Sequence, residues 1–219
     1  MDADSHRDKN VNLINIYRYT CKMKLPKFDN YKEEGPCDNG YETIQDFFLS
    51  WTLRCSPSSY KEANSKVQEY ARRIVCALIF GDNQNDSYSI HGQIPNTFHV
   101  IQVTTKRQLS SIDLLAEVTT NENGSEKKYV LNIENKWYSG LKQGQLKKYN
   151  EFVQKRFKGV VAINLFITCD ESRKNFGWEK EECRRYNYKY LTIRDLHSIS
   201  RMRDDGQTGN ALFDEYWFG

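Results

Sequence analysis

The sequence predicts an α/β fold in which helices flank a mixed β-sheet. Two β-like ranges, Ile112–Val118 and Tyr129–Trp137, enclose the polar, glycine-containing segment Thr119–Lys128, a pattern typical of an antiparallel hairpin with a loose turn. Val160–Thr168 is a nearly continuous apolar run, as expected of a buried strand that pairs in parallel. Apolar residues at helical spacing before and after these ranges supply the flanking helices.

Length and composition favour one domain. The chain has 219 residues, and a globule of this length can bury about 70% of its unfolded surface without disulfide bonds. Hydrophobic residues make up only 38% of the chain, but the 13% of aromatic residues supply bulk for a core. We expect residues 1–40 to form an N-terminal arm and loop packed on the domain, and residues 41–219 to form a single domain.

The charge balance excludes a polycationic protein. The net charge is +3, from 32 basic and 29 acidic residues, so any binding of nucleic acid must come from local clustering of basic side chains. The six cysteines have no C-x-x-C spacing, and the four histidines have no metal-ligand spacing. The sequence has no recognisable signal peptide and no apolar run long enough to span a bilayer. We therefore expect a cytoplasmic protein with reduced thiols and no membrane contact.

Two helices are predicted before the hairpin. Apolar residues recur at helical spacing from Tyr41, and a longer helix runs from about Tyr60 to Phe80, where Gly81 ends it. The range Asn83–Pro95 is predicted to be a polar loop, and Thr97–Thr105 is predicted to be a strand that precedes the hairpin.

Helices and one further strand are predicted after the hairpin. A helix is expected over Gly140–Phe157, a strand over Tyr188–Ile193 and a terminal helix over Asp195–Met202. The tail Ala211–Gly219 is aromatic for a chain end, so we expect it to dock on the core or to contribute to a dimer contact. The sequence therefore leaves undecided whether the protein forms a homodimer.

Polar residues gather at one predicted end of the hairpin. Glu134 and Lys136 point to the same side of their strand, and Asp113 near the start of the other strand can lie opposite them. Converging carboxylate oxygens suit Mg²⁺, and a neighbouring ammonium can position a water or stabilise a phosphate under attack. The alternative is an exposed strand end with an ion pair, which would be worth only about 0–1 kcal/mol.

These residues resemble the core of a known family. Asp113, a spacer across one turn, and Glu134-x-Lys136 are similar to the core of the PD-(D/E)XK nuclease superfamily, and Gln145-x-x-x-Tyr149 on the following helix matches an extension found in many of its members. The resemblance spans roughly residues 41–168. Ile112 stands where a proline often precedes the first aspartate, a position that carries no chemistry. The resemblance implies a restriction-endonuclease-like fold with the site at one edge of the sheet.

The resemblance also implies an activity. It implies a metal-dependent nuclease that hydrolyses phosphodiester bonds, most simply of DNA, by a metal-activated water, with Mg²⁺ or Mn²⁺ as cofactor. Asp113 and Glu134 would be the metal ligands, and Lys136 and Gln145 would complete the catalytic set. For Gln145, the alternative is that it only satisfies a backbone group.

Three further residues are accessory candidates under the same resemblance. Glu117 shares the strand face of Asp113, and Tyr149 lies one turn after Gln145, where a core position is the alternative. Glu42 precedes a Leu-x-Trp-x-Leu pattern that resembles the first helix of one branch of the superfamily, where a glutamate can lie beside the metal site. Its alternative role is a helix-start acid that interacts with the helix dipole.

Basic residues on the predicted helix after the hairpin could bind the substrate. Lys142, Lys147 and Lys148 are a solvated face if taken alone, but next to an anionic site they could follow a phosphate backbone. The contrasting hypothesis is a catalytically silent nucleic-acid-binding or assembly module that kept the fold. The presence of all three core residues argues against it. Whether DNA, RNA or a branched junction is cleaved, and whether at ends or internally, stays open.

Overall fold

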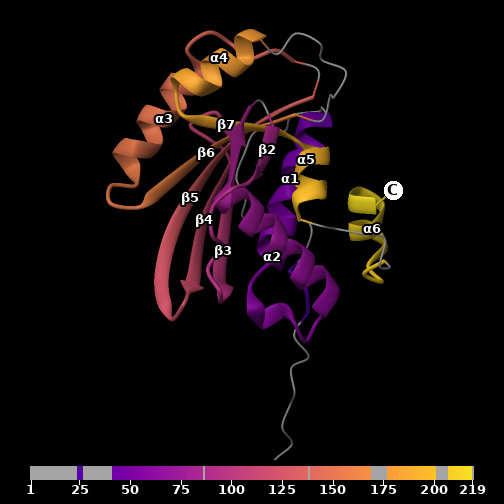
Figure 1. Ribbon diagram of the computed structural model, residues 1–219. Helices are drawn as coiled ribbons and strands as arrows, with labels where there is room; N and C mark the ends of the chain where they lie inside the picture. The colour runs from indigo at the N-terminus through magenta and orange to yellow at the C-terminus, as the bar shows by residue number, and fades with distance from the viewer. Residues whose placement is uncertain are drawn as a thin grey trace, which may run out of the picture.

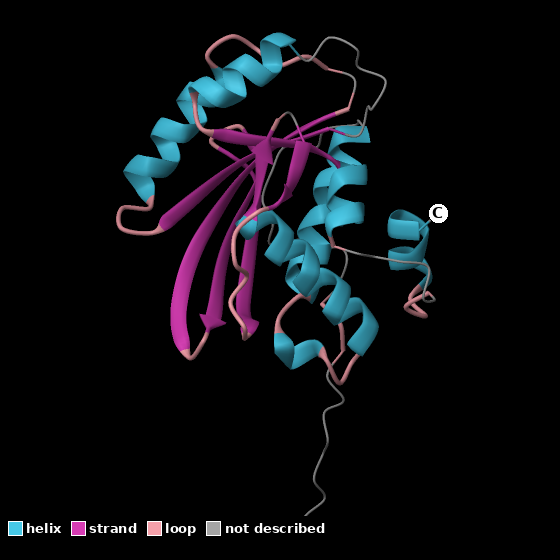
Figure 2. Ribbon diagram, in the orientation of Figure 1, coloured by secondary structure: helices cyan, strands magenta, loops and turns pink. Residues whose placement is uncertain are grey.

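A five-stranded mixed sheet lies at the centre of the molecule, with helices on both of its faces (Figures 1 and 2). The structure is a computed structural model that describes residues 24–26, 41–85, 87–137, 139–168, 177–200 and 207–218. In Figure 1, α1, α2 and α6 lie on one side of the sheet, and α3 and α4 lie on the other. The predicted α/β class with a mixed sheet is therefore confirmed.

The strands follow the order β3-β4-β5-β6-β7. The first three, β3 (Phe98–Leu109), β4 (Ile112–Glu122) and β5 (Ser125–Lys136), are antiparallel. Two further strands, β6 (Val161–Thr168) and β7 (Tyr188–Thr192), continue the sheet in parallel with β5. The predicted parallel pairing of the apolar run is thus confirmed, and β5 lies at the centre of the sheet.

The turn between β4 and β5 is tighter than the predicted loose turn. Only Asn123 and Gly124 separate the two strands, and both have positive φ angles, of 50° and 87°. An Asn-Gly pair suits the two-residue hairpin turn whose twist matches that of the strands. The prediction of a loop over Thr119–Lys128 was wrong because polar side chains on a solvated strand end look like loop residues in the sequence.

The main hydrophobic core lies between the sheet and two helices. These helices are α1 (Tyr41–Cys55) and α2 (Ser65–Phe80), and the short helix η1 (Ser58–Tyr60) lies between them. Asn64 begins α2, because its side chain accepts hydrogen bonds from the backbone of Lys66 and Val67. The sheet contributes the inward side chains of its central strands to this core, among them Leu114, Ala116, Leu131, Ile133 and Leu165.

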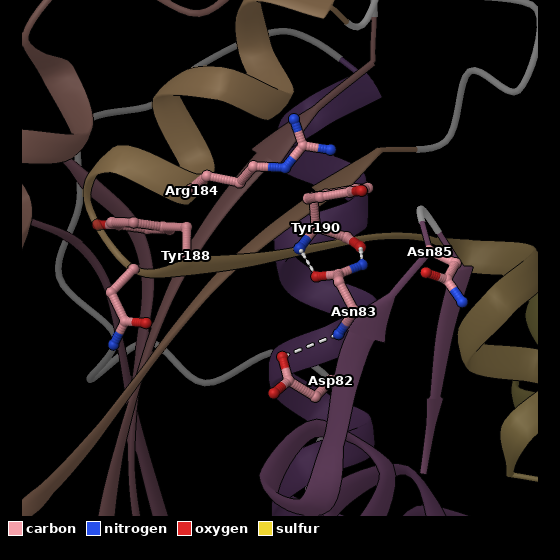
Figure 3. A pocket seen from close by; sticks show the side chains of 7 residues that line it. Asp82, Asn83, Asn85, Arg184, Tyr188 and Tyr190 are labelled. Atoms are coloured by element: carbon pink, nitrogen blue, oxygen red, sulfur yellow. Dashed lines mark hydrogen bonds between the residues drawn. The ribbon is translucent and has the colours of Figure 1, made fainter. Parts of the chain in front are cut away.

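A small hairpin follows α2 where a polar loop was predicted. It consists of β1 (Gly81–Gln84) and β2 (Ser87–Ile90). The Asn83 side chain donates to the Tyr190 carbonyl at 2.7 Å and accepts from the Tyr190 backbone N–H at 2.9 Å (Figure 3). A side-chain amide thus mimics a strand partner at the outer edge of β7. Sequence periodicity could not reveal this, because the strands are short and polar.

The other face of the sheet is covered by α3 (Gln145–Arg156) and α4 (Gly177–Arg185). The predicted helix over Gly140–Phe157 begins later, because Gly144 adopts a left-handed φ of 76° immediately before Gln145. Lys142 therefore lies in the preceding loop and not on the helix. The clusters of apolar side chains under α3 and α4 are smaller than the core on the opposite face.

The C-terminal segment packs on α1. After α5 (Ile193–Ile199), α6 (Ala211–Phe218) buries Phe213 completely, and the Trp217 indole N–H donates to the Thr52 hydroxyl at 3.0 Å. The predicted docking of the aromatic tail is therefore confirmed. Of the expected N-terminal arm, only residues 24–26 lie within the described part of the chain, where the Pro26 carbonyl accepts from the Trp51 indole.

No helix in the described residues is long and apolar enough to cross a membrane.

A buried acid lies beside the turn between β4 and β5. Glu122 is 3% exposed and accepts hydrogen bonds from the Tyr129 hydroxyl at 2.7 Å and the Thr120 hydroxyl at 2.8 Å. Burial alone would raise the pKa of Glu122, but the Tyr129, Lys127 and Thr120 contacts outweigh burial and lower it.

We predict that Glu122→Gln lowers the free energy of unfolding by about 1–2 kcal/mol at pH 7, because hydrogen bonds to a charged acceptor are worth more than those to a neutral one. The pKa of Glu122 is lowered by folding, so its contribution is present above the ordinary carboxyl pKa and is lost as the pH falls through the lowered value. Urea denaturation should show a larger difference from wild type at pH 7 than near pH 3.

The matched control for this prediction is Glu126→Gln. Glu126 is 58% exposed and contacts the exposed Lys128 at 3.6 Å, so its replacement should change stability by less than about 0.5 kcal/mol. An equal loss of stability for Glu122→Gln at both pH values would contradict the electrostatic explanation.

Candidate active site

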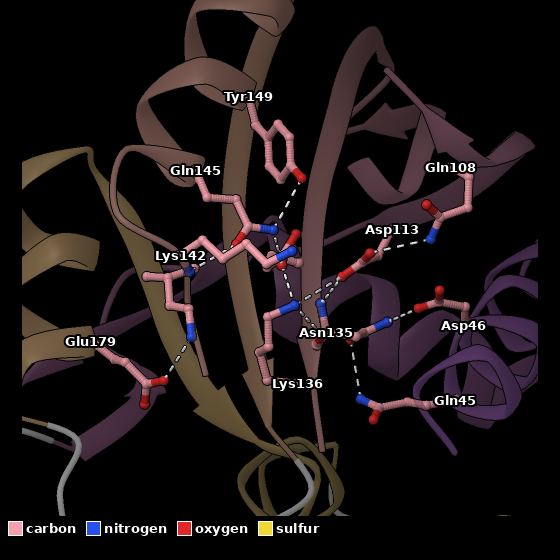
Figure 4. Close-up of polar contacts among 12 residues, drawn as sticks. Gln45, Asp46, Gln108, Asp113, Asn135, Lys136, Lys142, Gln145, Tyr149 and Glu179 are labelled. Carbon is pink, nitrogen blue, oxygen red and sulfur yellow. Dashed lines mark hydrogen bonds and ion pairs between the residues drawn. The ribbon is translucent and has the colours of Figure 1, made fainter. Parts of the chain in front are cut away.

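Three consecutive polar residues are buried at the end of β5. Glu134 and Asn135 are 0% exposed and Lys136 is 6% exposed, because β5 lies between β4 and β6 and both faces of the sheet are covered. Successive side chains of a strand point to opposite faces. Glu134 and Lys136 therefore face α3, where Gln145 contacts Glu134. Asn135 faces α1, and Figure 4 shows Lys136 and Asn135 pointing apart.

On the α3 side, Asp113 joins Glu134 and Lys136. The Lys136 ammonium contacts the Glu134 carboxylate directly and lies 3.8 Å from Asp113 Oδ2. Asp113 Oδ2 also accepts the Asn135 backbone N–H at 2.9 Å, and Asp113 Oδ1 accepts from the Gln108 side chain at 3.2 Å. The predicted convergence of two carboxylates and an ammonium at one end of the hairpin is therefore what the geometry shows.

The two carboxylates have raised pKa values. Burial is the main cause for Glu134, and the neighbouring negative charge of Asp113 adds to it, while Lys136 acts in the opposite direction. Burial also raises the pKa of Asp113, and Lys136 and the Asn135 N–H offset it in part. Two acids that resist ionisation next to one buried cation form a site that an additional cation would stabilise.

Gln145 connects α3 to this cluster. Its Nε2 donates to Glu134 Oε1 at 2.6 Å and to the Tyr149 hydroxyl at 3.0 Å, and its Oε1 accepts the Lys142 backbone N–H at 3.1 Å. Because α3 begins at Gln145, the first helical residue points at the end of β5. Tyr149 is 5% exposed and packs in the apolar cluster under α3, so it combines a core position with support of Gln145.

On the α1 side, two consecutive residues hold Asn135. The Gln45 side chain donates to Asn135 Oδ1 at 3.1 Å, and Asn135 Nδ2 donates to the Asp46 carboxylate in a short contact. Figure 4 shows both α1 side chains directed at Asn135. We call this set, Gln45, Asp46 and Asn135, the Asn135 clamp. It joins α1 to the strand segment that carries Glu134 and Lys136.

Asp46 adds a third carboxylate, which is buried and has a cation nearby. Asp46 is 2% exposed, and burial together with the nearby charge of Asp113 raises its pKa well above the ordinary value. The positive charges of Arg107 and Lys136 act in the opposite direction. Arg107 is 7% exposed on β3, and its guanidinium lies 3.5 Å from the centre of the Phe47 ring.

Sequence reasoning missed Gln45, Asp46 and Arg107. One signal was available for Asp46, because it precedes Leu49 by three residues and Leu53 by seven, which places it on the buried stripe of α1. A carboxylate on an apolar helical stripe indicates a buried polar partner. No local pattern identified that partner as Asn135.

Not every predicted residue joins the cluster. Glu117 is 45% exposed, contacts Lys106 at 3.9 Å and lies four residues farther along β4 than Asp113, roughly 13 Å away. Glu42 belongs to α1, but its side chain lies outside the described residues. Lys147 and Lys148 are exposed on α3, and Lys142 is exposed in the loop before it.

The residues at the site fit a hard divalent cation. Within the described ranges, no three histidine, cysteine or acidic side chains are grouped as a metal cluster. However, Glu134 Oε2 is buried and has no hydrogen-bond partner in the described part of the chain, and Asp113 lies beside the same lysine. A buried acceptor without a donor is costly, and one or two carboxylates are the usual protein ligands of Mg²⁺.

The fold and the site together define a class of protein, one with a mixed sheet between helices and with Asp, Glu and Lys gathered at the end of the central hairpin. A family model described as the PD-(D/E)XK nuclease superfamily matches residues 48–217. The chain belongs to this superfamily, and its fold is restriction-endonuclease-like. No curated protein and no solved structure gives a significant match.

We predict that the Asn135 clamp contributes to stability through coupled hydrogen bonds. Asn135→Ala should lower the free energy of unfolding by about 1–3 kcal/mol, because it removes one hydrogen bond from each of the buried side chains of Gln45 and Asp46. Chemical denaturation of Asn135→Ala, Asp46→Ala and the double variant measures the coupling, which we expect to be about 1 kcal/mol or more.

Gln102→Ala is the matched control for the clamp, because Gln102 is an exposed residue of β3 in the same sheet. Its effect should stay within about 0.5 kcal/mol. Strictly additive losses for Asn135→Ala and Asp46→Ala would contradict the clamp.

Proposed function

We propose that this protein is a divalent-metal-dependent nuclease that hydrolyses phosphodiester bonds, with DNA as its substrate class. The observation that carries the proposal is the buried cluster of Asp113, Glu134 and Lys136, in which one carboxylate oxygen of Glu134 has no donor in the described residues. Asp113 and Glu134 would hold Mg²⁺ or Mn²⁺, and the bound cation would supply an activated water and stabilise negative charge on the phosphate.

Lys136 has the position expected of a group that stabilises the phosphate. Its ammonium lies at the end of the same strand as Glu134 and contacts both proposed ligands, so it is held where the substrate would approach them. A preorganised positive charge in a buried site acts more strongly on developing negative charge than the same charge in water. Its long side chain is held in place by the carboxylates and by the covered strand end.

Gln145 and Tyr149 have a positioning role in this proposal. Gln145 donates to Glu134 Oε1 and leaves Oε2 available, so it orients the carboxylate. Tyr149 supports Gln145 through its hydroxyl. The exposed Lys142, Lys147 and Lys148 would contribute phosphate contacts that do not depend on base sequence. Packing of α6 on α1 supports our proposal that residues 41–219 form one domain.

We predict that Lys136→Ala reduces cleavage in Mg²⁺ by about 10²–10³-fold, the usual value of one preorganised charge-stabilising group. Binding measured in Ca²⁺, which should bind without supporting turnover, should change much less because many phosphate contacts share the affinity. The control is Lys128→Ala, an exposed residue at the other end of β5 that should leave both quantities unchanged.

Two outcomes would contradict the role proposed for Lys136. Equal losses of cleavage and of binding would make Lys136 a general phosphate-binding residue. Failure of the wild-type protein to cleave any nucleic acid would favour a binding or assembly module that kept the fold. Circular dichroism and a melting curve of the variant separate both outcomes from unfolding.

We further predict that Mg²⁺ or Mn²⁺ raises the melting temperature of the wild-type protein, because a ligand that binds only the folded state stabilises it by mass action. Asp113→Asn should remain folded and lose most of this response, since it removes one proposed ligand and one of the repelling charges. Differential scanning calorimetry of both proteins with and without the metal checks both statements without an activity assay. An unchanged metal response in Asp113→Asn would exclude Asp113 as a ligand.

A further inference from the structure

A basic groove lies at the opposite end of the sheet from the candidate active site. Its volume is about 930 Å³, and it lies between η1, the first turns of α2 and the start of β3. Glu134 and Lys136 end β5, whereas the groove adjoins Phe98 and His99, which pair with the last residues of β4. In Figure 1, the β4–β5 turn marks this end of the sheet, away from α4.

The groove concentrates positive charge. Four cationic side chains and one acidic side chain line it, so it carries three net positive charges, as many as the whole chain. Glu69 binds both Arg72, at 2.7 Å, and Arg73, at 2.8 Å. Lys61 and Lys66 are exposed, and the Lys66 ammonium donates to the Gln207 carbonyl at 3.2 Å.

The chemistry of the lining suits phosphate groups. Hydroxyl and amide side chains lie among the cations, including Ser58, Asn96 and Thr97. Basic, hydroxyl and amide groups together make up most contacts that proteins form with nucleic-acid backbones. The low net charge of the chain means that such contacts must come from local clusters of this kind.

β3 is the edge strand of the sheet, and it lies between the groove, which adjoins α2, and the opposite side of the sheet, which Asp113 faces. His99, at the groove, and Lys106 are exposed, and their partners on β4 lie on the same face as Asp113. A register shift between Val100 and Gln102 brings His99 to this face. Near the end of the strand, Gln108 donates to Asp113. Between His99 and Gln108 the strand covers roughly 26–30 Å, the length of about 8–9 base pairs of duplex DNA.

We propose that this groove is a second binding site for the backbone of the nucleic acid that is cleaved, and that the substrate lies along β3 between the groove and Asp113. The inference rests on the proposed nuclease function. It assigns the enzyme a preference for substrates that extend more than about nine base pairs from the cleaved bond. Shorter substrates reach only the catalytic cluster.

The test uses hairpin DNA duplexes with stems of 6 and 24 base pairs, and the variant Lys61→Glu/Lys66→Glu. Binding in Ca²⁺ to the long stem should weaken at least tenfold, and the slope of log affinity against log salt concentration should fall by about two. Cleavage of the short stem in Mg²⁺ should stay within about twofold of wild type, since neither lysine is part of the catalytic cluster.

The matched control is Lys155→Glu/Lys158→Glu, which makes the same change of charge at exposed positions at the end of α3. The neutral variant Lys61→Gln/Lys66→Gln, with melting curves for all proteins, guards against an effect of unfolding. The groove site would be overturned if the control weakened binding equally, or if both Lys61/Lys66 variants bound the long stem as tightly as the wild type. Cleavage by the wild-type protein in the same experiment would still support the nuclease. If the wild-type protein cleaved neither stem, the proposed DNA nuclease and the second binding site would be overturned together.

Discussion

Burial of three consecutive polar side chains at the end of β5 is the constraint on which the rest of the structure depends. A central strand has no solvent on either side, so the hydrogen-bonding groups of Glu134, Asn135 and Lys136 must find partners within the protein. The α3 side supplies Asp113 and Gln145. The α1 side supplies two consecutive residues, so both helices are fixed relative to the same strand end.

Electrostatics at this strand end oppose folding of the cation-free protein. Three carboxylates, those of Asp46, Asp113 and Glu134, lie here with raised pKa values, and the loss of solvent around them is the first cause in each case. Lys136 and Arg107 reduce the repulsion but do not provide a donor for every oxygen. A buried charge that lacks a full complement of partners is costly for stability and useful for binding a cation, which is how stability and function compete here.

The two faces of the sheet have different tasks. The α1 and α2 face carries the large apolar core, and α6 adds Phe213 and Trp217 to it. The α3 face holds smaller apolar clusters, and on this face the polar side chains of β3 are largely exposed and those of β4 are half-buried. Stability thus rests mainly on one face, and the other face carries the candidate active site.

Much of this arrangement could be predicted from local sequence. Alternation along two strands placed Asp113 opposite Glu134 and Lys136, and helical spacing placed Gln145 one turn before Tyr149. The apolar run of β6 indicated a parallel central pairing. These predictions depend on periods of two or 3.6 residues within one segment, which the chain determines by itself. The tight Asn123-Gly124 turn is also determined by local sequence. We did not predict it because the polar residues at the adjoining strand ends resemble loop residues.

Only the tertiary structure decided which distant residues meet. Gln45 and Asp46 contact Asn135 across about 90 positions of sequence. Arg107 of β3 contacts the ring of Phe47 on α1. Glu117 shares the face of Asp113 but lies too far along β4 to join it. The physical reason is that local periodicity fixes the face to which a side chain points, whereas the packing of α1 against the sheet and the register of β4 fix its position along that face.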